Sequence, residues 1–355
     1  MTRESHEDDL TAIVHGMKTV ASPFRTVLNE LHRTYQAYTE GMLFQATPDL
    51  ARANPNWFGI CVADTSGQIY EVGDSQHAFT SQALATPFVY GMVLADQGRD
   101  AVLARIGVRP ADDNFHLPDP PGQCLPNPLV PAGALATVSM LAGSTTTDRL
   151  NHVLELFQRY TGHEMRIDAT VFTASRLSGH RYRALAYHML DRGLIGEHVD
   201  ETLDLFFQQQ SLLITCRDLA VMGATLANGG TNPVTGEAIL SPEHVRDLLS
   251  VMHTCGMRNF QGEWSYRAGI PAESGVSGGL LAVVPGQVGI GIFSPPLGPH
   301  GHSLRGIKVI YDLVQRFGLH QFDAPHGGTK LREALAGRSA TTARNRVARA
   351  LETPD

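Results

Sequence analysis

The fold can be predicted from Trp57-Phe-Gly-Ile-Cys-Val-Ala63 and Gln68-Ile-Tyr-Glu-Val72, which are joined by Asp64-Thr-Ser-Gly67. Two runs of β-branched and aromatic residues around a short polar turn that ends in glycine indicate a β-hairpin. Near the other end of the chain, Leu280-Leu-Ala-Val-Val-Pro285 and Val288-Gly-Ile-Gly-Ile-Phe293 are two more short apolar runs, separated by Pro-Gly. Strands at both ends of a chain with helices between them predict an antiparallel sheet covered by helices, which is an α/β (α+β) fold.

The sequence between these strands has apolar residues at helical spacing. A break at Pro23 divides a first helical segment, 10–38, into two helices. A long helix is expected over 82–96, and residues 109–131 are rich in proline and polar residues, which favours an ordered loop. Further helices are predicted over 132–142, 146–160, 176–192, 201–208, 216–228, 241–254 and 303–317.

Composition excludes several classes of function. The chain has 355 residues, 43% of them apolar, and a net charge of -7, and its basic residues are dispersed except in the tail Arg332 to Arg349, so no nucleic-acid partner is expected. No stretch has the roughly 18 consecutive apolar residues of a membrane helix, and the polar start is not a signal peptide. We therefore expect a cytoplasmic protein with no membrane partner.

Cysteine and histidine spacing predicts neither a disulfide framework nor a metal site. Cys61, Cys124, Cys216 and Cys255 form no Cys-x-x-Cys pair, so reduced thiols are expected. The histidines show no two-His spacing with a carboxylate on one helix face, and His300-x-His302 lies in a Pro-Gly-rich loop. No metal or other cofactor is predicted.

Eight short signatures occur in one order along the chain. They are Gly73-Asp74, Phe79-x-x-Gln82, Asn127-Pro128-Leu129, Ala132-Gly133-Ala134, Leu226-Ala-Asn-Gly-Gly230, Met252-His-Thr-Cys-Gly-Met257, Ser274-Gly-Val-Ser-Gly-Gly279 and Ser294-Pro-Pro-Leu297. Together they resemble the serine-dependent glutaminases, from about Gly41 to about Val314. The resemblance implies a β-lactamase/DD-peptidase-like fold, in which helices flank the sheet and a helical lobe is inserted, and self-association into a homo-oligomer.

The expected domain organisation has three parts. Residues 1–40 are a helical extension, and residues 41–325 are the glutaminase-like domain. That domain comprises an α/β part, 41–100 and 255–320, and a helical lobe, 101–254. Residues 326–355 are a polar, basic tail, expected to dock as a strip and then to be disordered or to form one surface helix.

The family's chemical groups are absent at the matching positions. Phe79-Thr-Ser-Gln-Ala-Leu-Ala-Thr-Pro-Phe88 matches the segment in which the family carries Ser-x-x-Lys, and it has Ala83 and Thr86 there. In Gly41-Met-Leu-Phe-Gln-Ala-Thr-Pro48, Ala46 stands where the family has its tyrosine. A serine needs a neighbouring base, and alanine has no attacking atom. None of the three lysines follows a serine by three positions, so shifting the alignment does not recover the base.

The groups that hold the substrate in the family also differ. Pro131 and Tyr182 replace asparagines, and Ser175 replaces the glutamate that would pair an α-ammonium. Phe206 and Arg258 stand at positions of tyrosines, and Glu273 replaces a lysine, which reverses the local charge. A buried ammonium without a carboxylate costs several kcal/mol, so free glutamine is expected to bind poorly.

The expected pocket is therefore roomier and more apolar than in the family. Its predicted lining is Ala46, Gln82, Ala83, Thr86, Asn127, Pro131, Ser175, Tyr182, Phe206, Arg258 and Val276. The backbone N–H groups around Val276 either form an oxyanion hole or serve only a tight turn, and Gln82 and Asn127 either face the pocket or only brace the backbone. Arg258, Tyr182, His116 and His180 are candidates for reactive groups.

Three functions remain open from the sequence. The expected one is a cavity repurposed to bind or convert a larger, partly apolar small molecule, with specialised biosynthesis as the proposed setting. The second is a catalytically inactive homologue with a regulatory or structural role. The third is a glutaminase-type amidohydrolase with an unconventional nucleophile such as Ser81, Ser175 or Thr86.

Overall fold

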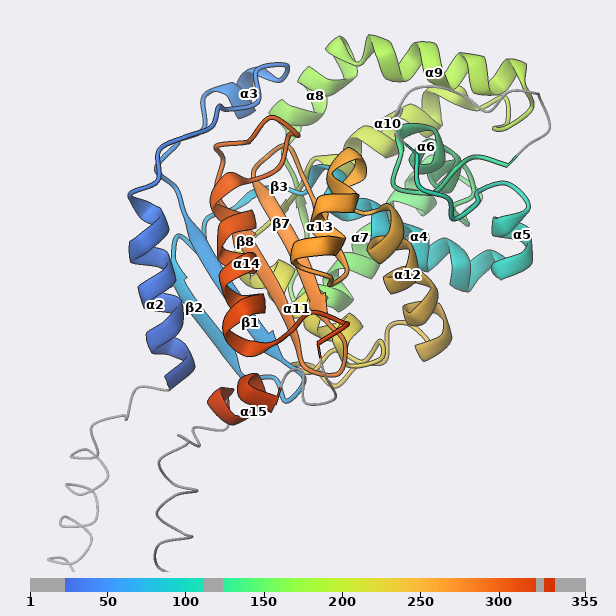
Figure 1. The fold of residues 1–355 in the computed structure, drawn as a ribbon. Coiled ribbons are helices and arrows are strands. Elements are labelled where there is room, and N and C mark those ends of the chain that lie inside the picture. The colour runs from blue at the N-terminus through green and yellow to red at the C-terminus, as the bar shows by residue number, and fades with distance from the viewer. Residues whose placement is uncertain (1–22, 112–123, 324–328, 336–355) are drawn as a thin grey trace, which may run out of the picture.

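Five antiparallel strands from the two ends of the chain form the central sheet (Figure 1). The computed structural model describes residues 23–111, 124–323 and 329–335. The strand order is β2-β1-β8-β7-β6, and the bounds are β1 (Gly59–Asp64), β2 (Ile69–Gly73), β6 (Ala272–Ser274), β7 (Gly279–Val284) and β8 (Val288–Phe293). β1, β7 and β8 are buried along their whole length, so the centre of the sheet is covered on both faces. The predicted sheet is confirmed.

The first hairpin forms because its turn satisfies its own backbone. The carboxylate of Asp64 accepts hydrogen bonds from the backbone N–H groups of Ser66 at 2.9 Å and Gln68 at 3.0 Å. Gly67 has φ +86°, a value that residues with a Cβ rarely adopt. The register that follows pairs Cys61 with Glu71 and, on the other edge of β1, with Gly291 of β8.

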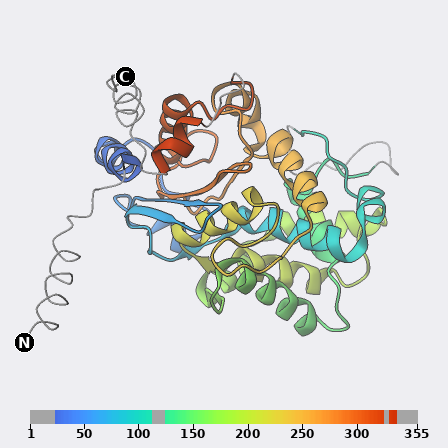
Figure 2. The ribbon, with the colours of Figure 1, turned by 90° about the horizontal axis from the view of Figure 1, so that it is seen from below.

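Two helical layers enclose the sheet (Figure 2). One contains α2 (Pro23–Gln36), α14 (Leu304–Phe317) and α15 (Thr329–Leu335), and the other contains α11 (Cys216–Ala227). α11 lies very close to β8, since a Cβ added to Gly289 would lie 2.1 Å from the backbone nitrogen of Ala224. The glycines of Val288-Gly-Ile-Gly-Ile-Phe293 therefore let a helix pack directly on the sheet.

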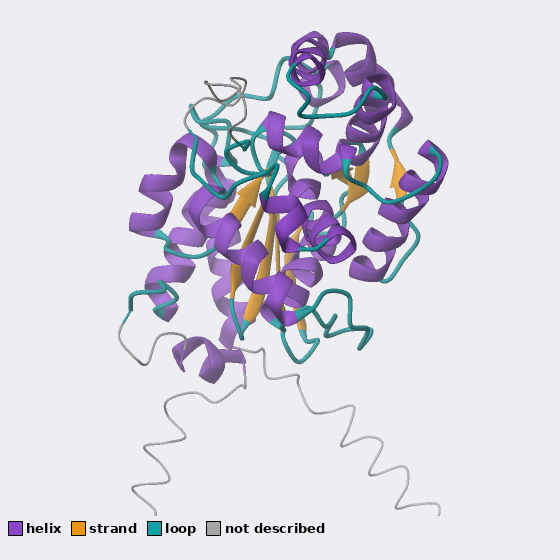
Figure 3. Ribbon diagram, turned by 90° about the vertical axis from the view of Figure 1, so that its right-hand side faces the viewer, coloured by secondary structure: helices purple, strands orange, loops and turns teal. Residues whose placement is uncertain are grey.

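Most of the remaining helices form a lobe beside the sheet. Its members are α4 (Thr86–Gln97), α5 (Arg99–Leu103), α6 (Pro131–Ser139), α7 (Thr146–Thr161), α8 (Ala169–Ser178), α9 (His180–Asp191), α10 (Val199–Gln210) and α12 (Pro242–Cys255). A small second sheet lies apart from the central one (Figure 3). Its order is β3-β5-β4, from β3 (Phe79–Thr80), β4 (Arg166–Ile167) and β5 (Leu212–Ile214).

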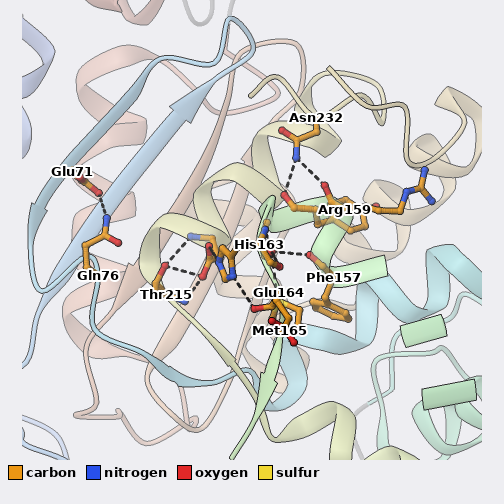
Figure 4. A network of polar contacts seen from close by, with 12 residues as sticks. Glu71, Gln76, Phe157, Arg159, His163, Glu164, Met165, Thr215 and Asn232 are labelled. Carbon is orange, nitrogen blue, oxygen red and sulfur yellow. Dashed lines mark hydrogen bonds and ion pairs between the residues drawn. The ribbon is translucent and has the colours of Figure 1, made fainter. Parts of the chain in front are cut away.

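The polar contacts in Figure 4 fix the ends of two helices of this part of the chain. Thr215 and Asp218 form a reciprocal cap at the start of α11, and the ring of His163, just after α7, bonds the Asp218 carboxylate at 2.9 Å. The side-chain amide of Asn232 donates to the backbone oxygens of Arg159 at 3.0 Å and Tyr160 at 2.9 Å, near the end of α7. These bonds hold α7 and α11 against each other, so the lobe is anchored to the layer that covers the sheet.

Several elements differ from the predictions. The segment predicted as one helix over 176–192 is two helices, α8 and α9, because Gly179 between them has ψ +41°. The helix predicted over 82–96 begins with a 3-10 turn, η1 (Gln82–Ala85), before α4. α11 falls within the range 101–254 assigned to the helical lobe but packs on the sheet.

Some short elements were not predicted, and some predictions fall on residues that are not described. The unpredicted helices are α3 (Pro48–Ala51), η2 (Arg258–Phe260) and α13 (Gln261–Arg267). Within the tail, α15 is a short helix. The first of the two helices predicted in 10–38, most of the loop 109–131 and the end of the tail lie outside the described residues. Among the residues that are described, no helix is long and apolar enough to cross a membrane.

Candidate active site

A cavity of about 370 Å³ opens between η1, the junction of α8 and α9, and the turn after β6. Its walls come from segments far apart in sequence. They are Phe44, Ala46, Thr47, Gln82, Ala83, Ser175, Ser178, Gly179, Arg181, Tyr182, Phe207, Gln210, Arg258 and Val276. Predicted pocket residues from five separate segments are thus brought together in one hollow.

The backbone at Gln82 turns sharply and presents Ala83 to the cavity. Gln82 has φ +50°, an uncommon value for a residue with a Cβ, and its side-chain amide donates to the Thr80 hydroxyl at 3.0 Å. Ser81 points elsewhere, because its hydroxyl is buried and donates to the backbone oxygen of Gln209 at 2.9 Å. Strained backbone of this kind is concentrated at functional sites, where the surrounding structure maintains it.

The glycine-rich turn after β6 forms the opposite wall. The backbone N–H of Gly275 donates to the oxygen of Gly279 at 2.9 Å, and that of Gly278 donates to the oxygen of Gly275 at 3.0 Å. Val276 lies between these bonds, is partly exposed, and its backbone N–H has no hydrogen-bond partner among the described residues. A Cβ on Gly275 would lie 3.1 Å from the Ser81 oxygen, so the turn and η1 approach closely. The arrangement can offer a backbone donor to an oxyanion.

Arg258 reaches the cavity from a second strained turn. Met257 has φ +60° and Arg258 has φ +48°, both in the left-handed region. His302 holds this turn in place, because its Nε2 donates to the Met257 oxygen at 3.0 Å and its Nδ1 accepts from the Ser274 hydroxyl. Burial, together with the charge of Arg258, lowers the pKa of His302 to about 3, so the ring is neutral at physiological pH.

Glu273 is a buried acid beside Arg258. Its side chain is 1% exposed, one carboxylate oxygen accepts from the backbone N–H of Ser274 at 3.2 Å, and the other has no hydrogen-bond partner in the described part of the chain. Burial raises its pKa to about 7, while the charge of Arg258 acts in the opposite direction. Glu273 pairs with Leu281 of β7, and paired residues on neighbouring strands point to the same face of a sheet. Leu281 packs in the same core cluster as Leu84 of η1. The carboxylate therefore lies on the face of the sheet that carries the cavity.

Aromatic side chains close a third side. Tyr182 of α9 shares a side-chain hydrogen bond with Gln210, and burial raises the pKa of its hydroxyl. Its ring lies 5.0 Å from that of Phe206, which is fully buried, and 5.9 Å from that of Phe207, which lines the cavity. Ser175 is one turn before the end of α8 and also lines the cavity.

The structure separates the sequence-predicted residues into two groups. Ala46, Gln82, Ala83, Ser175, Tyr182, Arg258 and Val276 line the cavity. Thr86, Asn127, Pro131 and Phe206 are buried and do not line it. Thr86 and Pro131 are the first residues of α4 and α6, and the side chain of Asn127 bonds the backbone of Arg109, Leu129 and Val130.

Of the two histidine candidates, only His180 is described, and it does not line the cavity. His180 is exposed at the first residue of α9, and His116 lies outside the described residues. No group of three His, Cys, Asp or Glu side chains able to hold a metal ion occurs in the described ranges, and the four cysteines are free.

Several residues that line or support the cavity were not predicted from the sequence. Phe44, Arg181, Phe207 and Gln210 line the cavity, and His302 supports it, although none of these was predicted there. Arg181 and Gln210 lie close in sequence to the predicted residues Tyr182 and Phe206, which is only a weak indication that they line the site. Nothing in the sequence connects His302 to Met257. A larger hollow of about 670 Å³, between α12 and the segment after α14, includes none of the predicted residues.

The comparisons with known proteins agree with one another. The sequence model of the family described as Glutaminase matches residues 41–322. A glutaminase of Trichormus variabilis is 50% identical over 304 residues, which cover 85% of this chain and 91% of that protein. A glutaminase of Microcystis aeruginosa is 45% identical over 337 residues, which cover 94% of this chain and 99% of that protein.

Solved structures show the same likeness. A crystal structure of Mglu in its glutamate form has a TM-score of 0.82 and 34% identity, covering 85% of this chain and 70% of that one. A probable glutaminase from Bacillus subtilis, complexed with 6-diazo-5-oxo-L-norleucine, has a TM-score of 0.77 and 29% identity, covering 83% and 96%.

These relatives require a correction to the functional prediction. Curated proteins that are 45% to 50% identical over most of this chain are named glutaminases. That similarity points to glutamine hydrolysis, and it contradicts both the cavity repurposed for a larger, partly apolar molecule and the inactive homologue. The prediction rested on single side chains and gave too little weight to the similarity of the whole domain.

Proposed function

Because this chain belongs to the glutaminase family, we propose that it hydrolyses the side-chain amide of L-glutamine to glutamate and ammonia. The observation that carries the proposal is the 50% identity to a curated glutaminase over 85% of the chain. The cavity between η1 and the turn at Val276 supports it, since a strained backbone and an unpaired N–H face one hollow.

The proposal includes the positions of the family's reactive groups. We propose that Ala83, Thr86 and Ala46 occupy the places of the family's serine, lysine and tyrosine. Of the three alternative hydroxyls, Ser175 lines the cavity, whereas Ser81 and Thr86 are buried away from it. Ser175 has no hydrogen-bonded base among the described residues, so a water molecule is the simpler source of the attacking oxygen.

The reaction then proceeds by direct hydrolysis. The water oxygen forms a bond to the amide carbon, and the negative charge that develops on the amide oxygen is received by the backbone N–H groups of Ala83 and Val276. The carbon–nitrogen bond breaks, and protons from the water pass to the departing nitrogen. Both water protons end on this nitrogen, so the products are the glutamate carboxylate and ammonium, and all atoms and charges are accounted for.

The test is the release of ammonia from L-glutamine by the purified full-length chain. Parallel assays with D-glutamine and L-asparagine measure selectivity, and the folded state of each sample is checked by circular dichroism. Ser175→Ala is expected to keep its activity if water attacks, and to lose it if the Ser175 hydroxyl does. A folded protein that releases no ammonia above the buffer rate would refute the proposed function.

We also propose that the chain self-associates, as its resemblance to the family suggests. Light scattering coupled to size-exclusion chromatography tests this, and a mass of one chain at micromolar concentration contradicts it.

A further inference from the structure

Two arginines contribute positive charge to the cavity wall. Arg181 and Arg258 are among its lining residues, and the described lining contains no aspartate or glutamate. A ligand carboxylate would find the Arg258 guanidinium at this wall, whereas no acidic side chain of the described lining would pair a ligand ammonium. Charge-assisted hydrogen bonds from arginine to carboxylate are among the stronger polar contacts in proteins.

Arg258 is the better placed of the two arginines. Its guanidinium makes no hydrogen bond to the described residues, and its Nε is buried without a partner. Its nearest counter-charge is the carboxylate of Glu273, which bonds the backbone of Ser274 instead. A guanidinium has five N–H donors in a planar fork, so Arg258 retains the donors that a bidentate carboxylate needs.

Hydrogen bonds from His302 fix the backbone segment that carries Arg258. His302 joins the Met257 oxygen to the Ser274 hydroxyl, so one buried ring ties together the neighbours of Arg258 and Glu273. This clamp maintains the left-handed backbone at Met257 and Arg258. Strain that the surroundings maintain fits a binding role better than an accidental surface position.

We infer that Arg258 forms a carboxylate subsite in this cavity, which holds a substrate by its carboxylate and leaves its α-ammonium unpaired. The inference rests on the proposed function only in taking the cavity as the place where a glutamine-like molecule binds. The ligand class is a short carboxylate with an amide or a second carboxylate at its far end. The subsite does not require the α-ammonium.

Binding calorimetry at pH 6 on the full-length chain tests the subsite with three probes. They are L-glutamate, glutarate, which lacks the ammonium, and L-glutaminamide, which keeps the ammonium but has no carboxylate. Glutarate is expected to bind at least as tightly as L-glutamate, and L-glutaminamide far more weakly. Arg258→Gln should weaken the binding of both carboxylates about tenfold to a hundredfold, since a hydrogen bond to a charged group contributes roughly 1.5–3 kcal/mol.

Arg246→Gln is the matched control, because Arg246 is an exposed arginine of α12 that lines a different hollow. It should leave all affinities unchanged. Equal binding of glutarate by the Arg258→Gln variant and the unmodified chain overturns the subsite, as does equal binding of L-glutaminamide and glutarate.

Glu273→Gln gives a second test that does not depend on losing Arg258. The charged or titratable groups that face Glu273 are Arg258 of η2 and Cys255 of α12, and His302 lies near Arg258. Removing the competing carboxylate should tighten glutarate binding severalfold at pH 8.5, and unchanged affinity there argues against the subsite. Ammonia release is measured separately. Carboxylate binding that depends on Arg258, without ammonia release, refutes the proposed function alone. Ammonia release together with unchanged glutarate binding by the Arg258→Gln variant refutes the subsite alone.

Discussion

Replacing Glu273 with glutamine should make the protein more stable at alkaline pH. In the unfolded chain this carboxyl loses its proton near 4.5, whereas burial in the folded protein raises its pKa to about 7. Between these values the folded protein binds the proton more tightly than the unfolded chain does, so the free energy of unfolding falls as the pH rises. At about 1.4 kcal/mol per pKa unit, the loss reaches about 3 kcal/mol above pH 7.

The glutamine variant carries no charge to bury, so it escapes this loss. The difference in unfolding free energy between Glu273→Gln and the unmodified chain should grow by about 3 kcal/mol between pH 4.5 and pH 8.5. The acid-induced loss that comes from the lowered pKa of His302 occurs in both proteins and cancels in the comparison.

Urea unfolding followed by circular dichroism at several pH values measures the difference. Glu263→Gln is the control, because Glu263 is an exposed glutamate of α13 that pairs with Arg267 at 3.1 Å. Its difference from the unmodified chain should not grow with pH. A flat difference for Glu273→Gln as well would show that Glu273 is ionised in the folded protein without cost, and the account of a strained acid beside Arg258 would be wrong.

Three further outcomes are expected. The double variant Ala83→Ser with Thr86→Lys should release ammonia about a hundredfold faster than Ala83→Ser alone, since a positioned base contributes roughly that factor; equal rates would contradict the assignment of these positions. In urea titration at pH 7, His302→Ala should lower the free energy of unfolding by about 3 kcal/mol, because two buried hydrogen bonds and a buried ring are lost. The variant should also lack the destabilisation that the unmodified chain shows as the pH falls from 6.5 towards 3. Gly289→Ala should destabilise the fold by several kcal/mol in thermal unfolding, because its Cβ would meet the α11 backbone at 2.1 Å, whereas Gly196→Ala, which has open space around it, should change little; similar melting temperatures would mean that α11 yields easily.

The central sheet was predictable because its signals are local. The turn Asp64-Thr-Ser-Gly67 satisfies its hydrogen bonds within a few residues, and the run Val288 to Phe293 shows its apolar character in its own sequence, although its glycines pack against the distant helix α11. The small second sheet was not predictable, since β3 and β4 are two residues long and, among the described strands, each pairs with β5, which is distant in sequence. Strands of that length have no periodicity to detect.

The candidate site divides in the same way. Motif positions located Ala83 and Val276, which the structure brings to facing walls, but motif order could not exclude Thr86 or Phe206 from the cavity. Which side of a helix faces a hollow depends on tertiary packing, and the contact of His302 with Met257 links segments that share no sequence signal. The function was misjudged for a different reason, because the prediction relied on differences at single positions and not on the similarity of the surrounding domain.

The pairing of β1 with β8 has a consequence for how the protein is made. Gly59 pairs with Phe293, so β1 stays without its inner neighbour β8 until most of the chain has been synthesised. During that time the β1–β2 hairpin exposes an apolar edge that can associate with other chains. Slow translation or a shortage of chaperones should therefore lower the yield of native protein. The edge of β1 is covered only after the late strand β8 has been synthesised.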